Sequence, residues 1–368
     1  RNSVNLVFVR LMRDIASYHV TRIVAEKGDP RAADSPLRQA YLSRFADREG
    51  REFLLGFYSR YRDLDRDQIL ATLARRARSS AAAQSVVFRS LRPEAGVAEL
   101  ADFLDPKRRR ARNEAESRDL YDTYAQERFS LNDRGYIASV HPLELWLAAY
   151  LSKAPGSTFG DIVESGGQAR QDAYAWLFRP KMRKAQDLRI RILLEEEAFE
   201  RIAASWQRLG YPFERLVPSY ATSIGSSGDR PAALAELMGV IVNDGLRLPT
   251  SRFERLRFAE DTPFETVMKL NATGGERVLR SEVAETLRAA LVDTVERGTG
   301  RRASGVFQSR EGKPLIAGGK TGTGDHRYER FGRNGEVIGS RVVNRTATFV
   351  FFLGERHFGV ISAHVAGP

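Results

Sequence analysis

Cysteine is absent from all 368 residues of the chain. Its absence excludes disulfide bonds, thiolate catalysis and zinc sites built on cysteine. The five histidines show no metal-binding spacing such as HExxH, so we predict no metal and no cofactor. Long hydrophobic runs are also missing, because no window approaches the roughly 18 apolar residues that a membrane-spanning helix needs. The chemistry of the chain must therefore come from ordinary polar side chains.

The composition is that of a folded protein with an excess of positive charge. Hydrophobic residues make up 42% of the chain, which excludes disorder, and the net charge is +11. Such an excess favours an anionic partner without choosing among nucleic acid, phospholipid and acidic polymer. The basic run KRRRAR (107–112) contains no aromatic residue, so we interpret it as a solvated or lipid-facing surface and predict no nucleic-acid binding.

The first half of the chain has a helical texture. Apolar spacing predicts one amphipathic helix from Asn5 to about Lys27. Residues 35–210 continue with dense Arg, Ala, Glu and Leu, which predicts six to eight further helices, with breaks at prolines and at Gly50 and Gly135.

The second half alternates helices with strands. Pro231 near its start and a glycine at its end predict a helix at 229–243, and a second helix is predicted at 281–297. The stretch 313–323 is predicted to be a strand. Residues 346–355 are apolar on both faces, as a central strand requires, and should form a hairpin with 356–365.

One lysine stands among glycines in the stretch AGGKTGTGDHRYERF (317–331). A phosphate-binding P-loop would need a glycine where Pro314 stands, and a helix directly after the lysine. A dinucleotide-binding fingerprint would need its third glycine where Arg327 stands. Neither kind of nucleotide site is therefore predicted.

The third candidate is the K-T-G strand of serine acyl-transfer enzymes, which works with an S-x-x-K nucleophile and an S-x-N loop. Ser3-Val4-Asn5 heads the first predicted helix, and YATSIGSSGDRPAALAELMGVIVNDGLRLP lies between it and Lys320-Thr321-Gly322-Thr323. In this order the three elements resemble the transpeptidase domain of penicillin-binding proteins. The resemblance covers about residues 1–27 and 200–368.

The resemblance implies an α/β (α+β) fold: an incomplete serine β-lactamase/transpeptidase-like fold, with an antiparallel sheet and flanking helices. Residues 1–29 and 200–368 would form the penicillin-binding domain without its N-terminal part. Residues 30–199 would be a large all-α insertion that makes the chain mainly helical. The stretch from HPLELWLAAYL onward is similar to a subgroup of bifunctional transglycosylase-transpeptidases of Gram-negative bacteria.

The implied activity is that of a peptidoglycan D,D-transpeptidase, which cross-links D-Ala-D-Ala stem peptides through a serine acyl-enzyme. Carboxypeptidation uses the same residues, so the sequence does not distinguish between the two activities. Ser3 would relay protons, Asn5 would orient the lysine of the nucleophile motif, and Lys320 would hold Ser3 and add positive field. Substrate contacts would come from Thr321, Gly322 and Thr323, the last supplying a backbone N–H to the oxyanion hole.

The nucleophile itself is not found. No serine is followed three residues later by a lysine, and the only hydroxyl match, Thr266–Lys269, follows S-x-N instead of preceding it. We therefore expect the nucleophile upstream of Arg1, in a longer protein, and expect this chain alone to be inactive. The same missing part should leave the strand at 356–365 as an exposed apolar edge.

The resemblance also implies partners and a compartment. The substrate would be a peptidoglycan stem peptide, and β-lactams would inhibit the complete protein covalently. The location would be the periplasmic face of the bacterial inner membrane, with an anchor outside this chain. For residues 30–199, a membrane surface and an envelope partner are both candidates. The alternative function is a non-catalytic, transpeptidase-like binding or scaffold module of the cell envelope.

Overall fold

The computed structural model describes residues 3–105, 114–251, 253, 255–269, 274–331 and 337–367, with side chains from Asn5 onward except that of Phe331. The chain forms two compact units. Arg1–Thr21 together with Glu195–Pro368 is called the sheet unit here, and Arg22–Leu194 is called the helical unit. The dividing points fall within helix α1 (Ser3–Lys27) and helix α11 (Arg183–Arg208).

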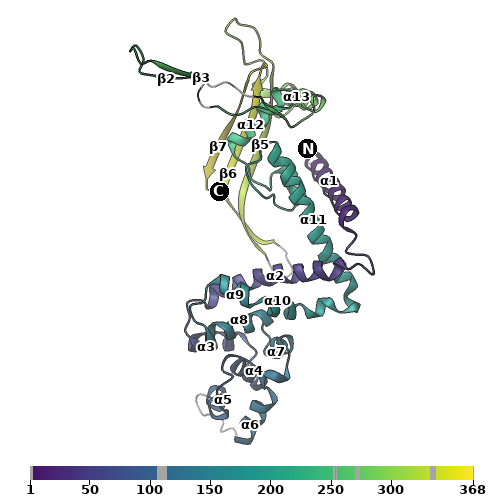
Figure 1. Cartoon of the computed structure of the whole chain (residues 1–368), viewed down its shortest axis with the longest axis vertical. Helices are drawn as coiled ribbons and strands as arrows, with labels where there is room; N and C mark the ends of the chain where they lie inside the picture. Colours follow the sequence, from purple (N-terminus) through teal and green to yellow (C-terminus); the bar gives the residue numbers. More distant parts are fainter. Residues whose placement is uncertain are drawn as a thin grey trace. The chain divides into compact units, whose positions relative to one another are not determined.

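The helical unit is built from short helices, most of them two to three turns long (Figure 1). Before α11 these are α2 (Leu37–Tyr61), α3 (Arg66–Arg76), α4 (Ala81–Leu91), α5 (Val97–Leu104), α6 (Glu114–Thr123), α7 (Leu131–Ala138), α8 (Pro142–Lys153), α9 (Phe159–Ser165) and α10 (Gly167–Ala173). The described residues thus contain ten helices from α2 to α11, and the predicted number of six to eight was too low. Several of these short helices begin at a capping residue, whose side chain accepts a hydrogen bond from a backbone N–H of the first turn. These capping residues are Asp65, Ser80, Ser130 and Thr158.

Two glycines that we predicted to break helices lie inside them. Gly50 is within α2, where a Cβ atom would lie 2.7 Å from Cγ of Arg170. Gly135 is within α7, where a Cβ atom would lie 2.9 Å from Cγ of Pro142. Both glycines allow a close contact between helices, and that packing offsets the cost of about 1 kcal/mol of glycine in a helix.

The core of the helical unit surrounds α8. Leu143, Leu145 and Leu147 of this helix are fully buried, together with Tyr61 of α2 and Phe88 of α4. Burying a leucine side chain stabilises a fold by about 1.5–3 kcal/mol, so α8 contributes strongly to the stability of the unit. No helix in the described ranges is long and apolar enough to cross a membrane.

The sheet unit contains a three-stranded antiparallel sheet in the order β5-β6-β7 (Figure 1). Its strands are β5 (Ala317–Phe331), β6 (Val337–Leu353) and β7 (His357–Ala366). The predicted hairpin at 346–365 is confirmed, although β6 begins nine residues earlier than we predicted, at Val337 rather than at Thr346. Strand β5 begins at Ala317 and extends well beyond the predicted end at Thr323.

Helices α12 (Pro231–Val242) and α13 (Ser281–Glu296) pack on one face of this sheet, close to their predicted positions. Phe352 of β6 is fully buried between Met238 and Val242 of α12 and Leu291 of α13. The predicted fold class is confirmed: an antiparallel sheet with flanking helices, and a large helical segment that makes the chain mainly helical.

Helix α1 packs against α11 within the sheet unit. Met12 and Ala16 are buried against Phe199, Ile202 and Ala203 of α11.

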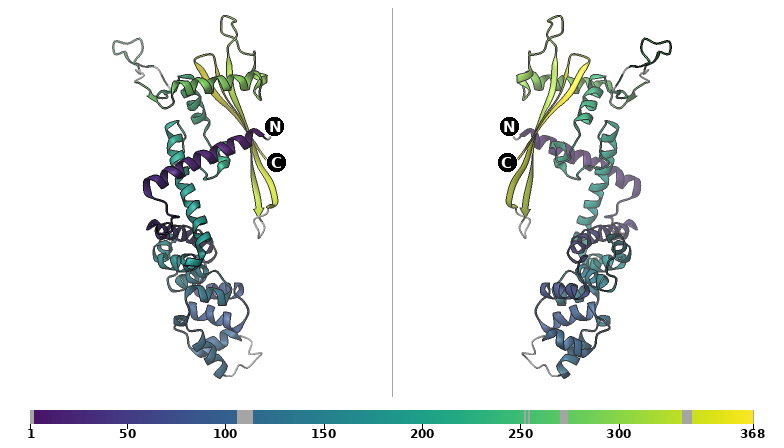
Figure 2. Two further views of the ribbon diagram at one scale, coloured as in Figure 1. Left: turned by 90° about the vertical axis from the view of Figure 1, so that its right-hand side faces the viewer. Right: turned by 90° about the vertical axis from the view of Figure 1, so that its left-hand side faces the viewer.

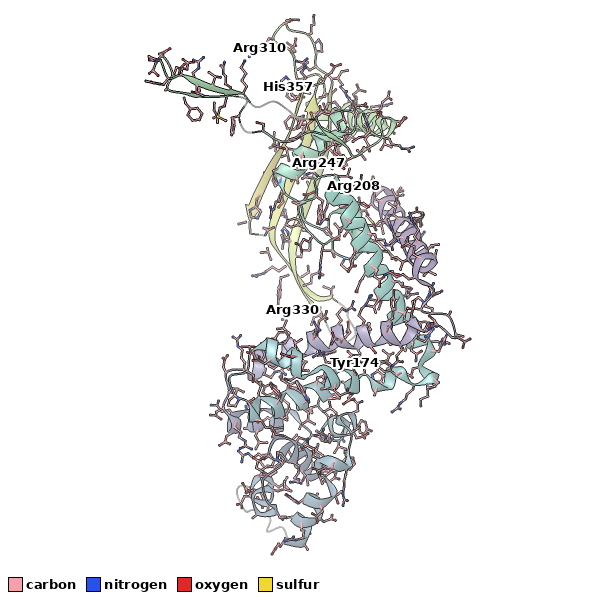
Figure 3. All side chains as sticks on the ribbon, viewed as in Figure 1. Tyr174, Arg208, Arg247, Arg310, Arg330 and His357 are labelled. Carbon is pink, nitrogen blue, oxygen red and sulfur yellow. The ribbon has the colours of Figure 1, made fainter. Side chains whose placement is uncertain are left out.

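Arg247 connects the end of α11 to α12. Its guanidinium donates to the carbonyl oxygens of Gln207 and Arg208 and to Glu236 Oε1, the last at 2.6 Å. Arg208 and Arg247 are labelled together at this point in Figure 3.

Two small pairs of antiparallel strands complete the described part of the sheet unit. Strand β1 (Leu246–Arg247) pairs with β4 (Glu276–Arg277), and β2 (Arg255–Phe258) pairs with β3 (Thr266–Lys269). Thr266 and Lys269, the only hydroxyl–lysine pair with nucleophile spacing, therefore lie on an exposed strand. Figure 2 shows the three-stranded sheet in two further views.

Candidate functional site: the free edge of strand β5

The predicted substrate-binding residues lie on an edge strand. Lys320, Thr321, Gly322 and Thr323 follow one another in β5, which pairs with β6 on one side only. In the described sheet no strand covers the other side, so a row of backbone N–H and C=O groups is open to an added strand. The chain continues as a strand to Phe331, whereas either nucleotide-binding loop would lead into a helix.

Lys320 lies on the helix-covered face of the sheet. It stands directly opposite Val350, and antiparallel partners project to the same face, here the face packed by α12 and α13. Its Nζ donates to the carbonyl oxygen of Thr321 at 2.7 Å and is exposed. The ammonium thus stays beside the strand edge, where it can attract an anionic group.

Thr321 has a hydroxyl partner from the segment that follows α13. Its Oγ1 lies 2.7 Å from Oγ1 of Thr299, and either atom can be the donor. Consecutive residues of a strand project to opposite faces, so the ammonium of Lys320 and the hydroxyl of Thr321 offer hydrogen-bond donors from the two sides of the free edge.

Thr323 projects to the opposite face, since it stands opposite Ala347. There it lines an open hollow of about 460 Å³ together with Ala347, Ala363, Asp325 and Arg345, the last two standing opposite each other on neighbouring strands. The pKa of Asp325 is lowered, first by its hydrogen bond with Arg327 and further by the charges of Arg327 and Arg345. The hollow is therefore lined by a carboxylate that stays ionised, and it lies on the other face from Lys320.

The glycines of β5 differ in whether neighbouring atoms leave room for a side chain. A Cβ atom at Gly318 would lie 2.3 Å from the ring of Phe352, and one at Gly319 would lie 2.6 Å from the carbonyl oxygen of Val350. At Gly322 the nearest atom would be the carbonyl oxygen of Thr348, at 3.9 Å. Packing explains the first two glycines, but within the described residues it does not explain Gly322.

Of the predicted residues Ser3 and Asn5, the structure describes only the side chain of Asn5. Asn5 is exposed in the first turn of α1, and no hydrogen bond joins it to β5 among the residues described. The side chain of Ser3, which begins α1, lies outside the described residues, as do the basic run 107–112 and the expected upstream nucleophile.

The surroundings of Asn5 are apolar and exposed. Val7, Phe8 and Leu11, on one side of α1, are 61%, 44% and 52% exposed. Apolar side chains of this size are usually covered, so this side of α1 offers a surface for another apolar segment.

The predicted exposed edge at 356–365 is confirmed. Strand β7 pairs only with β6, and its side chains Ile361 and Val365 are 65% and 63% exposed. Within the described ranges no group of three or more potential metal ligands comes together.

The extension of β5 beyond Thr323 was missed at the sequence level. Residues 324–331 pair with β6 down to Val337, and the side chains of 324–330 are exposed. Hydrophobic alternation is the usual signal for a strand, and a ribbon without a buried face gives no such signal. The sequence indicates a strand here only through its charged residues, which stand at every second position: Asp325, Arg327 and Glu329.

Comparisons with known proteins give a distant likeness. No protein-family model matches the sequence, and no curated protein matches it. Among solved structures, the chain is similar to penicillin-binding protein 3 from Mycobacterium tuberculosis in complex with aztreonam, at 19% identity and a TM-score of 0.31. The alignment covers 48% of this chain and 42% of that one.

Two further structures have the same degree of similarity. The D,D-transpeptidase domain of a peptidoglycan glycosyltransferase from Eggerthella lenta is 17% identical with a TM-score of 0.29, over 48% of this chain and 46% of that one. Penicillin-binding protein 1A from Haemophilus influenzae is 20% identical with a TM-score of 0.29, over 47% of this chain and 27% of that one. The chain spans less than half the length of the solved structures to which it is similar.

Proposed function

We propose that the chain is part of a penicillin-binding acyltransferase, a peptidoglycan D,D-transpeptidase that acts through a serine acyl-enzyme. The observation that carries the proposal is Gly322, which lies on the free edge of β5 and whose Cβ position has, among the described residues, no neighbour closer than 3.9 Å. A missing side chain at this point lets the backbone of a peptide substrate pair closely with the strand. Lys320 and Thr321, immediately before Gly322 on the strand, offer an ammonium and a hydroxyl to the terminal carboxylate.

The reaction proceeds in two steps. A serine oxygen attacks the carbonyl carbon of the penultimate D-alanine, and the terminal D-alanine leaves as its amine takes a proton. The amine of a neighbouring peptide, or water, then attacks the ester and releases the serine. The backbone N–H of Thr323 stabilises the oxyanion, Lys320 adds positive field, and Ser3 and Asn5 move and orient the proton carriers.

In this proposal the serine comes from a segment outside the 368 residues. The penicillin-binding domain comprises 1–29 and 200–368, and 30–199 is a helical insertion that contacts a membrane surface or an envelope partner. The location is the periplasmic face of the bacterial inner membrane.

The test uses the chain extended upstream of Arg1 by its own genomic coding sequence. A fluorescent penicillin should label the extended protein on one serine of an S-x-x-K motif, and the 368-residue chain should stay unlabelled. The Lys320→Ala variant of the extended protein should label at least about tenfold more slowly, because the ammonium stabilises the developing charge. An extended protein without S-x-x-K and without labelling would refute the proposal.

A second function is favoured by one observation: no serine in the chain precedes a lysine by three residues. The chain would then be a non-catalytic binding or scaffold module of the cell envelope that keeps the transpeptidase-like architecture. Full complementation in cells by the extended Lys320→Ala protein, together with retention of an envelope partner, would favour this function over catalysis.

A further inference from the structure

The β5–β6 ribbon continues past the end of β7. Strand β7 pairs with β6 only as far as Asn344, whereas β5 and β6 remain paired to Phe331 and Val337. We call residues 326–331 and 337–344 the arm. Arg330, labelled in Figure 3, lies toward its far end, while His357 marks the opposite end of the sheet.

One face of the arm continues the face of Lys320. The pairing moves from His326–Asn344 to Arg327–Val342, so the extra residue is Val343, on β6. The alternation along β5 is therefore unbroken, and Tyr328 and Arg330 project to the same face as Lys320. Arg341 stands opposite Tyr328 and joins them on this face.

This face is positively charged and aromatic. Tyr328 is 61% exposed, and Arg330 and Arg341 are exposed, with no carboxylate partner anywhere in the described part of the chain. The two described acidic residues near this face do not neutralise it. Glu329 projects to the other face, and Asp325, also on that face, forms its ion pair with Arg327 at 2.8 Å.

The arm also continues the free edge of β5. A peptide that pairs as an added strand beside Gly322 can run along this edge, and Arg330 lies eight residues further on, about 27 Å away at 3.4 Å per residue. Guanidinium groups bind carboxylates through paired hydrogen bonds, and an exposed tyrosine packs against aliphatic stems.

We propose that this face of the arm binds the acidic side chains of an extended peptide and so selects acidic peptides for the site on β5. This inference rests on the proposed function for its link to the acyl-transfer site. The binding itself depends only on Tyr328, Arg330 and Arg341.

The test is a binding measurement on the full chain with a fluorescein-labelled peptide. The probe is the hexapeptide Glu-Thr-Glu-Thr-Glu-Thr with an amidated C-terminus, and the matched control replaces each Glu by Gln. Fluorescence anisotropy should show binding of the Glu peptide that weakens with salt, and at least about fivefold weaker binding of the Gln peptide.

Two double variants separate the arm from general charge. Arg330→Gln with Arg341→Gln should weaken Glu-peptide binding about fivefold, as expected for two exposed ion pairs. Arg310→Gln with Arg356→Gln removes the same charge from exposed positions of the sheet unit outside the arm, and should change binding less than twofold. Tyr328→Leu should also weaken binding, and unchanged circular dichroism melting of each variant would show that the fold is intact.

Several outcomes would overturn the inference. Equal losses in the two double variants would assign binding to net charge, and equal binding of the Gln peptide would remove the role of carboxylates. Arg-dependent binding of a 12-residue oligo-dT or of anionic phosphatidylglycerol vesicles, without peptide binding, would assign the arm to those partners. The probe lacks a terminal carboxylate, so its binding does not report on the acyl-transfer site. A failed penicillin-labelling test with intact peptide binding would therefore refute the proposed function alone, and the reverse result would refute only the inference.

Discussion

Gly318 of β5 and Phe352 of β6 stand directly opposite each other, so close that a Cβ atom at 318 would lie 2.3 Å from the phenylalanine ring. Phe352 is fully buried between the sheet and helix α12. The glycine therefore allows the ring to approach β5 closely, and this contact packs the strand that carries Lys320 against the core.

The first prediction is that Gly318→Ala destabilises the sheet unit. The new methyl group must displace a fully buried ring, and overpacking of this kind costs about 1–3 kcal/mol. Chemical denaturation followed by fluorescence of Trp206, in a background with Trp146→Phe and Trp176→Phe, measures the change in this unit. A free energy of unfolding equal to that of the parent would contradict the packing argument.

The second prediction concerns Gly322→Ala, the matched substitution four residues along the same strand. The methyl group meets only the carbonyl oxygen of Thr348, at 3.9 Å, so the free energy of unfolding should change by less than about 0.5 kcal/mol. In the extended protein it should slow labelling by a fluorescent penicillin about tenfold, because it displaces the paired peptide backbone. Normal labelling with normal stability would show that substrate does not approach this edge.

The two glycines also show what the sequence can and cannot predict. Helix positions followed from local signals, such as Pro231 at the first turn of α12, and both strands of the 346–365 hairpin followed from their apolar faces. Gly50 and Gly135 gave the same local signal as a helix end, but their role depends on Arg170 and Pro142, which only the folded chain brings close. A glycine that serves a distant contact cannot be distinguished from a breaker by its neighbours in sequence.

The candidate site was predictable only where the motif is continuous. The residues from Lys320 to Thr323 lie together because they are consecutive on one strand. The exposed arm beyond them has no buried face and so left no hydrophobic period in the sequence. Asn5 was assigned to the same site only because of the order of the motifs in the sequence, and its position relative to Lys320 stays a prediction.

The third prediction is that Glu144→Ala destabilises the helical unit. The carboxylate is 2% exposed and accepts hydrogen bonds from Arg60 at 2.6 Å, Arg76 at 2.7 Å and the Tyr61 hydroxyl at 2.9 Å. Its loss leaves the buried hydroxyl unpaired, while both arginines can turn to water, so we expect a cost of about 2–3 kcal/mol. Urea denaturation followed by circular dichroism measures it. The control Asp63→Ala breaks an exposed ion pair and should cost less than about 0.5 kcal/mol; equal effects would contradict the role of burial.

The fourth prediction is that the helical unit loses stability as the pH falls below 6.5. Burial lowers the pKa of His141 from its usual value of 6.5, and the charge of Glu144 opposes this only in part. The neutral ring accepts a hydrogen bond from the backbone N–H of Leu143 at 3.2 Å, and a protonated ring cannot. The unfolded chain therefore binds the proton more readily than the folded chain. The stabilisation is complete above pH 6.5 and is lost as the pH falls through the lower, folded pKa.

The measurement for His141 is the urea midpoint at pH 7.5 and pH 5.5, read from Trp146 and Trp176 in a Trp206→Phe background. The variant His141→Asn keeps a side-chain acceptor at the helix start but does not titrate in this range. The parent should lose more stability than the variant between the two pH values. Parallel losses would show that other groups cause the acid sensitivity.

The fifth prediction is that the free edge of β7 causes self-association, which one charge prevents. The strand is ten residues long, carries no lysine, arginine, aspartate or glutamate, and pairs with β6 only. Ile361 is 65% exposed on it. Long uncharged edges of this kind pair with other strands, and a lysine on the edge opposes such pairing at little cost, here less than about 0.5 kcal/mol.

Light scattering over a concentration series should show association of the parent and less association of Ile361→Lys. Ile338→Lys, the same change on the exposed arm part of β6, should leave association unchanged, and an equal reduction by both variants would mean that net charge, not the β7 edge, controls solubility.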